Sequence, residues 1–243
     1  MAALLADEDS AGPIAWALRS ADAVLAFTRS ASVIEVLRSR SRHLVVQDPT
    51  PPPAGPHASL WLARSLASLG FDATSDPPPL AFTEAEHREA ESRAPGLPRG
   101  FLAVHPGSGS LAKNWPGERF REAAHRIAGD EPWLLVRGPA DENLPAPDSA
   151  VEASEWPLRT LGALLSRAGL FVGNDSGVAH LAAASAAPTL ALFGPTDPAV
   201  WAPVGPAVEA LRPPTRVVAD LGVDEVVAAA RALRSGASGP PSG

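Results

Sequence analysis

Short apolar runs and amphipathic segments alternate along the second part of the chain. The apolar runs are rich in leucine and β-branched residues, as buried strands are, and they lie at 101–106, 133–138, 170–175 and 188–194. The amphipathic segments repeat apolar residues every three or four positions, as helices do, and they lie at 118–129, 158–169, 176–186 and 223–234. This alternation predicts an α/β fold with a parallel sheet and helices on both faces. Such sheets bind ligands at the carboxyl ends of their strands, so the polar residues after each apolar run are candidates for a site.

The first part of the chain has a similar but shorter pattern. It predicts a strand, a helix, a second strand and two further helices, in that order, at 21–28, 30–40, 42–49, 57–71 and 83–94. The segment PGLPRG at 95–100 then predicts a linker. We therefore expect a partial N-terminal α/β domain at 1–95, a C-terminal domain at 98–235 and a disordered, low-complexity tail at 236–243.

Composition and charge exclude several classes of protein. The 243 residues carry a net charge of −7, which argues against a nucleic-acid partner because such a partner needs a basic face. Cysteine is absent, so disulfides, thiolate metal sites and a cysteine nucleophile are excluded. No apolar run reaches the roughly 18 residues of a membrane span, and acidic residues interrupt the N-terminal apolar stretch. We therefore expect a cytoplasmic protein without a transmembrane segment or signal peptide.

The first motif that carries chemistry is HPGSGSLAKNWP at 105–116. Its small residues Ser108, Gly109 and Ser110 make a loop whose backbone N–H groups can approach an anion closely. Lys113, the single lysine of the chain, lies in the same loop, and a helix is predicted directly after it. A small-residue loop, a cation and a helix N-terminus together predict a phosphate site, although the spacing is not that of a Walker motif. The alternative is an ordinary connecting loop with a surface lysine.

The second motif is GNDSGVAH at 173–180, at the junction of a predicted strand and helix. The strand delivers Asp175 to its end, and Ser176 and Gly177 open a helix whose first N–H groups favour phosphate. His180 lies four residues after Ser176 and therefore on the same helix face. We also expect Asp175 to cap this helix, beside any role in a site, and a core position is the alternative for His180. The spacing is not that of a G-x-S-x-G nucleophile elbow, which disfavours a serine hydrolase.

Two further loops follow predicted strands. Thr196 lies in LFGPTDPAVWAP at 192–203, where its hydroxyl could reach a phosphate or a sugar, and a rigid turn is the alternative. Glu142 lies with Asp141 in VRGPADEN at 136–143, where a carboxylate could receive a ribose hydroxyl pair, and a solvated loop is the alternative.

Taken together, these motifs resemble glycosyltransferase family 9, the ADP-heptose:lipopolysaccharide heptosyltransferases and their relatives. The resemblance rests on three motifs in order, HPGS-x(4)-K-x-WP, then D-S-G-x-x-H-x-A, then LFGPTDP with W-x-P, and it covers about residues 98–235. It implies a GT-B fold, in which two Rossmann-like domains face across a cleft and the C-terminal domain holds a nucleotide-sugar donor. The implied activity is inverting transfer of a heptose-like sugar, from a donor of the ADP-heptose type to a lipopolysaccharide core or similar glycan.

The resemblance also implies roles for the residues of the motifs. Ser108, Ser110 and Lys113 would contact the diphosphate or the sugar, and Gly109 stays a substrate-binding candidate for its backbone N–H. Asp175 would hold the donor sugar or ribose. The phosphates would lie at Ser176 and Gly177, supported by His180, and Glu142 would lie near the nucleoside. Thr196 is kept as a substrate-binding candidate on the loop chemistry given above. The catalytic residues implied in this way are Lys113, Asp175 and His180.

The departing nucleoside diphosphate gains negative charge, so catalysis needs cations and dipoles directed at it. Lys113 and two helix N-termini could supply them, and the sequence has no Asp-x-Asp metal motif, so we expect no metal and no cofactor. A general base must also deprotonate the acceptor hydroxyl. The family carries that base in an opening strand, Gly-Asp turn and helix that this sequence does not contain. We therefore expect a shortened N-terminal domain, and we assign no general base.

Two other functions remain open from the sequence. One is a non-catalytic sugar-nucleotide-binding domain, or an inactive fragment, that has lost its acceptor half. The other is a different GT-B enzyme such as a sugar-nucleotide epimerase, against which the order of the motifs argues. The lipid-linked glycan acceptor that the family uses would also allow peripheral association with the inner membrane, but the sequence shows no basic amphipathic helix to support it.

Overall fold

The structure is a computed structural model that describes residues 13–52, 54–72, 77–138 and 150–237. Contacts divide the chain into two compact units, Met1–Ser75 and Asp76–Gly243. Each unit is built from parallel strands and helices, in agreement with the α/β class that the sequence predicts.

The second unit is built on a six-stranded parallel sheet with the strand order β5-β4-β3-β6-β7-β8. Its strands are β3 Leu102–His105, β4 Trp133–Arg137, β5 Ala150–Ser154, β6 Leu170–Asn174, β7 Thr189–Leu192 and β8 Val208–Leu211. From β3 the chain winds outward through β4 to β5, and it then returns to the middle and winds the other way from β6 to β8. The strand order therefore reverses between β3 and β6, which is where doubly wound sheets bind their ligands.

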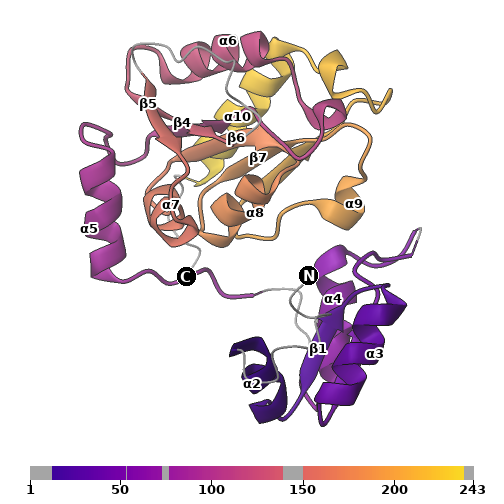
Figure 1. Ribbon diagram of the computed structural model, residues 1–243. Coiled ribbons are helices and arrows are strands. Elements are labelled where there is room, and N and C mark those ends of the chain that lie inside the picture. Colours follow the sequence, from indigo (N-terminus) through magenta and orange to yellow (C-terminus); the bar gives the residue numbers. More distant parts are fainter. Residues whose placement is uncertain (1–12, 53, 73–76, 139–149, 238–243) are drawn as a thin grey trace. The chain divides into compact units, whose positions relative to one another are not determined.

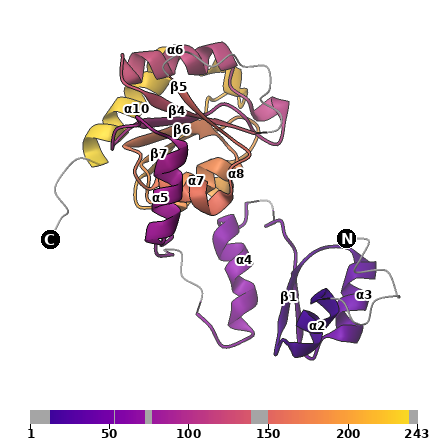
Figure 2. The same ribbon diagram turned by 60° about the vertical axis from the view of Figure 1, so that its left-hand side comes forward.

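Helices cover both faces of this sheet. The helices of this unit are α5 Glu84–Arg93, α6 Gly117–Ala128, α7 Leu158–Leu165, α8 Gly177–Ala184, α9 Pro198–Trp201 and α10 Val223–Ala237, with short 3₁₀ turns η1 Leu111–Lys113 and η2 Val218–Asp220. Helices α6 and α10 pack on one face and α7 and α8 on the other, as Figures 1 and 2 show. Two separate apolar cores follow, one on each face. Helix α10 extends to Ala237 and so includes the first two residues of the expected tail at 236–243. The rest of that tail, 238–243, lies outside the described residues.

The sequence pattern did not predict the two edge strands, β5 and β8. Their residues AVEAS and VEAL are mostly half-buried, whereas every residue of β3, β6 and β7 is buried. An edge strand packs against one neighbour and needs fewer apolar residues, so it has no clear apolar run.

The first unit contains a parallel two-stranded sheet and three helices among its described residues. Its elements are α2 Pro13–Ser20, β1 Val24–Phe27, α3 Ala31–Arg40, β2 Leu44–Gln47 and α4 Ala58–Ala67. Ala26 packs with Val33 and Leu37 of α3 to form a small core. The indole N–H of Trp61 donates to the carbonyl of Asp48 at 2.7 Å and attaches α4 to the end of β2.

Helix α5 belongs to the second unit, whereas the sequence placed it in the first. Ala90 of α5 is fully buried in the core that α7 and α8 share, and Glu91 accepts from Arg167 at 2.6 Å. The segment 95–100, expected to be an interdomain linker, instead connects α5 to β3, and Gly100 N–H donates to the Arg167 carbonyl at 2.9 Å. The partners of this polar helix lie more than 70 residues away along the chain, so local composition did not indicate where it packs.

The start of α5 is fixed by a carboxylate with two roles. Glu86 closes a capping box with Thr83, and it also pairs with Arg159 of α7. The Arg159 guanidinium, followed by the Thr83 backbone N–H, lowers the pKa of Glu86 from 4.5 to about 2. A carboxylate with a lowered folded-state pKa stabilises the fold above its unfolded pKa, and that contribution is lost as the pH falls toward the folded value.

We therefore expect Glu86→Gln to lower the melting temperature by a few degrees at most at pH 7, with the difference from the wild type shrinking between pH 4.5 and about 2. Thermal melts at a series of pH values measure it. Glu84→Gln is the matched control, because Glu84 pairs with Arg88 along the same helix and is well exposed. A difference that stays constant down to pH 2.5 would contradict the assigned ion pair.

Candidate functional site

Three loops of the second unit meet at the carboxyl edge of the sheet, where the strand order reverses. The first follows β3 and contains Lys113, the second follows β6 and begins with Asp175, and the third follows β7 and contains Thr196. Because β3, β6 and β7 are adjacent and parallel, their carboxyl ends lie side by side. Residues far apart in the sequence therefore reach one place.

Asp175 is the centre of this arrangement. Its Oδ2 atom accepts from the Lys113 ammonium at 2.7 Å and from the Thr196 hydroxyl at 2.6 Å. The Asp175 side chain is only 8% exposed, while that of Lys113 is 29% exposed. The ammonium therefore lies between a buried carboxylate and solvent, where it can also meet an incoming anion. Lys113 is therefore paired with Asp175 at this edge of the sheet, and its place in a binding site stays a prediction.

The glycine and serine loop is ordered by its own side chains. The Ser108 hydroxyl lies 2.8 Å from the Ser110 carbonyl and 2.6 Å from Asn114 Oδ1, and the Ser110 N–H lies 3.2 Å from Ser108 Oγ. Gly109 and Ser110 are exposed. The loop thus presents backbone to solvent at the predicted position, next to Lys113.

The start of α8 differs from two expectations drawn from the sequence, the cap formed by Asp175 and the core position considered for His180. Ser176, not Asp175, is the N-cap, and its hydroxyl accepts from the Ala179 N–H at 3.3 Å. The Asp175 carboxylate turns instead toward Lys113 and Thr196, because it can accept from a charged donor there. His180 is exposed and is not a core histidine. Gly177 is exposed at the first position of the helix, and a side chain there would meet open space.

Glu142 and its neighbour Asp141 lie outside the described residues. Groups of three or more His, Asp or Glu side chains that could hold a metal ion are not found in the described part of the chain. Within those same residues, no helix combines the length and the apolar composition that crossing a membrane requires.

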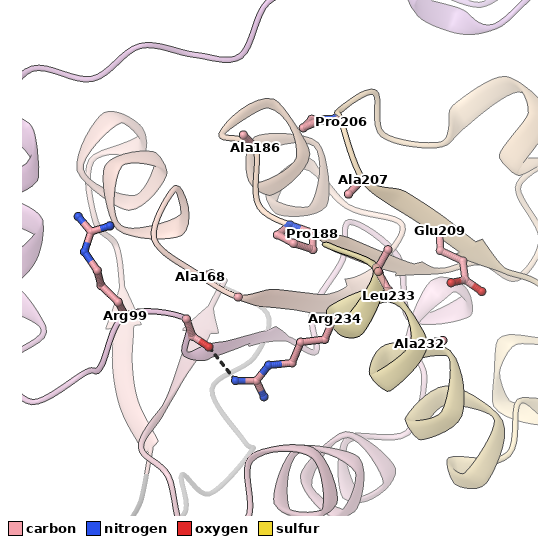
Figure 3. A pocket seen from close by; sticks show the side chains of 13 residues that line it. Arg99, Ala168, Ala186, Pro188, Pro206, Ala207, Glu209, Ala232, Leu233 and Arg234 are labelled. Carbon is pink, nitrogen blue, oxygen red and sulfur yellow. Dashed lines mark hydrogen bonds between the residues drawn. The ribbon is translucent and has the colours of Figure 1, made fainter. Parts of the chain in front are cut away.

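A hollow of about 950 Å³ lies at the opposite edge of the sheet (Figure 3). It is lined by residues that precede β3, β6, β7 and β8 and by the end of α10, where Arg234 donates to the Gly100 carbonyl at 2.9 Å. In a parallel sheet the amino and carboxyl ends of the strands lie at opposite edges. This hollow is therefore separate from the Lys113–Asp175 site. The candidate functional site is the one at the carboxyl edge, where charged and polar side chains meet.

Sequence reasoning missed Asn174, the last residue of β6. Its side chain is fully buried, accepts from the Trp115 N–H at 3.0 Å and donates to the Pro106 carbonyl at 2.6 Å. Asparagine is rare in this chain, with three occurrences, and two of them (Asn114 and Asn174) lie at this site. That rarity was the one available signal.

Comparison with known proteins identifies the family. The model of "Glycosyltransferase family 9 (heptosyltransferase)" matches residues 17–222. Lipopolysaccharide heptosyltransferase 3 of Escherichia coli is 28% identical over 151 residues, which cover 57% of this chain and 44% of the relative. Lipopolysaccharide heptosyltransferase 1 of Pseudomonas aeruginosa is 35% identical over 112 residues, 43% of this chain and 31% of the relative. The matched region thus spans less than half the length of these relatives.

Solved structures show the same fold. The E. coli ADP-heptose lps heptosyltransferase II has a TM-score of 0.73 at 19% identity, covering 93% of this chain and 81% of the other. A glycosyl transferase family 9 protein from Veillonella parvula has a TM-score of 0.72 at 19% identity, covering 88% and 74%. The fold is therefore of the GT-B type. With a family match that runs through both units, the chain belongs to glycosyltransferase family 9.

Proposed function

We propose that this chain binds a nucleoside-diphosphate sugar at the Lys113–Asp175 site and transfers a heptose-like sugar from it. The proposed donor is an ADP-sugar such as ADP-heptose, and the acceptor is a lipopolysaccharide core or related glycan. Transfer proceeds with inversion and without a metal ion. The curated relatives carry the name lipopolysaccharide heptosyltransferase, which supports this class of donor and acceptor.

The observation that carries the proposal is the meeting of Lys113, Asp175 and Thr196 where the strand order reverses. A diphosphate needs positive charge and N–H donors, and this edge offers one ammonium and the N-terminal ends of α6 and α8. The hydroxyl groups of a sugar need a hydrogen-bond acceptor, and the Asp175 carboxylate can supply one.

The nucleotide is assigned by analogy with relatives of the same fold. Structures of an E. coli heptosyltransferase have been solved with ADP and with ADP-2-deoxy-2-fluoro heptose. We therefore assign an adenine nucleotide here too. In our proposal Glu142 lies near the nucleoside, and it falls outside the described residues.

In the proposed reaction an acceptor hydroxyl oxygen attacks the anomeric carbon while the bond from that carbon to the diphosphate oxygen breaks. The bonding pair leaves with the diphosphate, and the hydroxyl proton passes to a base that we do not assign. Lys113 stabilises the charge on the leaving group, as an oxyanion-hole donor does. Exposed backbone at Gly109, Ser110 and Gly177 and the Ser108 and Ser176 hydroxyls complete the phosphate contacts, and His180 supports them.

Lys113 must then exchange partners when the donor binds. Without donor its ammonium pairs with Asp175, and with donor it would turn to the diphosphate and release a carboxylate oxygen for the sugar. Thr196 donates to that same oxygen and keeps the carboxylate in place during the exchange.

The test is a comparison of nucleotides and a measurement of turnover. Calorimetry should show ADP binding at least about tenfold more tightly than UDP, unchanged by EDTA, because the proposed site uses no metal. ADP-heptose and a lipopolysaccharide acceptor should then yield ADP and a product of inverted anomeric configuration by NMR. Binding of ADP-heptose without any release of ADP would overturn the transfer, and equal binding of UDP would overturn the choice of nucleotide.

A further inference from the structure

We propose that Asn174 is a positioning residue that sets where the Lys113 ammonium lies. Its amide holds both ends of the loop that carries Lys113, while the next residue, Asp175, binds the ammonium. The effect on the loop is independent of any ligand. The effect on catalysis rests on the function proposed above.

The first contact lies where β3 and β6 separate. The ladder between them pairs Leu102 with Leu170 at one end and His105 with Gly173 at the other. Beyond that point the Asn174 Nδ2 atom donates to the Pro106 carbonyl at 2.6 Å. The side chain therefore continues the link between the two strands past the end of their backbone pairing, at the first residue of the loop.

The second contact lies at the other end of the loop, where Asn174 Oδ1 accepts from the Trp115 N–H at 3.0 Å. Trp115 is itself fixed, since its indole N–H donates to the Leu221 carbonyl at 3.0 Å and its ring packs edge-on against Phe120. Lys113 precedes this fixed residue by two positions. The backbone of Lys113 thus has little freedom, and the position from which its long side chain extends is fixed.

Few side chains could replace this amide. The site needs a donor toward a carbonyl and an acceptor toward an N–H, and a short amide supplies both. Serine is too short to reach both groups, and leucine would leave two buried backbone groups unpaired. Aspartate would place a carboxylate oxygen against the Pro106 carbonyl and a second negative charge beside Asp175.

The single lysine of the chain allows a test without any ligand. A mild amine-acetylating reagent can modify Lys113 and the N-terminal amine alone, and peptide mass spectrometry separates the two. We expect slow acetylation of Lys113 in the wild type, because the buried Asp175 carboxylate engages its ammonium. Asn174→Ser should speed the reaction about three- to tenfold, as the loss of one or two hydrogen bonds loosens the loop.

Thr189→Val is the matched control for general destabilisation. Thr189 is also fully buried in the sheet and donates its hydroxyl to a backbone carbonyl, that of Ala187, at 2.8 Å, but it lies at the amino end of β7. It should lower the melting temperature and leave the acetylation of Lys113 unchanged. If Asn174→Ser does not fold, Asn174→Gln keeps the amide on a longer stem and should show a smaller acceleration. Wild-type reactivity in a folded Asn174 variant would overturn the proposal.

The link to the proposed function is tested by a double-mutant cycle on ADP affinity. Introduced into the wild-type chain, Asn174→Ser should weaken ADP binding about three- to tenfold. Introduced into the Lys113→Met variant, it should weaken ADP binding by less than about twofold. An equal loss in both backgrounds would overturn the claim that Asn174 acts through Lys113. If the wild type does not bind ADP, the proposed function fails, and the acetylation rates still decide whether Asn174 positions Lys113.

Discussion

Replacing Lys113 with methionine is expected to weaken ADP binding by about 1.5–3 kcal/mol, or roughly 10- to 150-fold. Methionine keeps most of the length of the side chain and removes the ammonium. The loss of ADP affinity therefore measures what the positive charge contributes to binding. The ammonium is partly exposed beside a carboxylate, and no other lysine exists in the chain to replace it. Isothermal calorimetry at fixed ionic strength measures the effect, because salt screens such an interaction.

Arg126→Met is the control for the change in net charge. Arg126 pairs with Asp224 at 2.6 Å on the helical face formed by α6 and α10, and we expect ADP affinity to stay within about twofold of the wild type. Lys113→Arg should recover part of the binding, because a guanidinium also binds phosphate but with a different reach. Unchanged ADP affinity in Lys113→Met would remove this residue from the site.

The interior of the second unit could be predicted from the sequence because its strands are buried on both faces. Continuous apolar runs such as LAVH in β3 and TLAL in β7 are typical of such strands. The edge strands β5 and β8 lack that pattern, since each has a neighbour on one side only. Sequence patterning thus identified the centre of the sheet better than its edges.

The candidate site was predictable for a topological reason. Lys113 and Asp175 are 62 residues apart, yet parallel strands place their following loops at one edge, and the ion pair forms there. Asn174 was not predictable in the same way. Its role depends on two backbone groups, the Pro106 carbonyl and the Trp115 N–H, and a backbone group gives no signal in a sequence.

Replacing Asp175 with asparagine should separate nucleotide binding from sugar binding. The carboxylate would no longer compete for the Lys113 ammonium, so plain ADP should bind at least as tightly as to the wild type. An ADP-sugar should bind no more tightly than ADP, because the carboxylate that would accept hydrogen bonds from the sugar hydroxyls is lost. The rate of sugar transfer should fall by about 100-fold or more. Calorimetry with ADP and with ADP-heptose, followed by turnover, measures the three quantities.

The same substitution should hardly change the melting temperature. The cap of α8 is supplied by Ser176, and the Lys113 ammonium can be solvated once its partner is neutral, because it is partly exposed. Asp197→Asn makes the same change in charge on a nearby exposed carboxylate that caps α9, and asparagine caps as well as aspartate. It should leave ADP binding and turnover unchanged. A large loss of stability in Asp175→Asn with unaltered sugar binding would make this aspartate structural, because its contacts with Lys113 and Thr196 would then serve the fold alone.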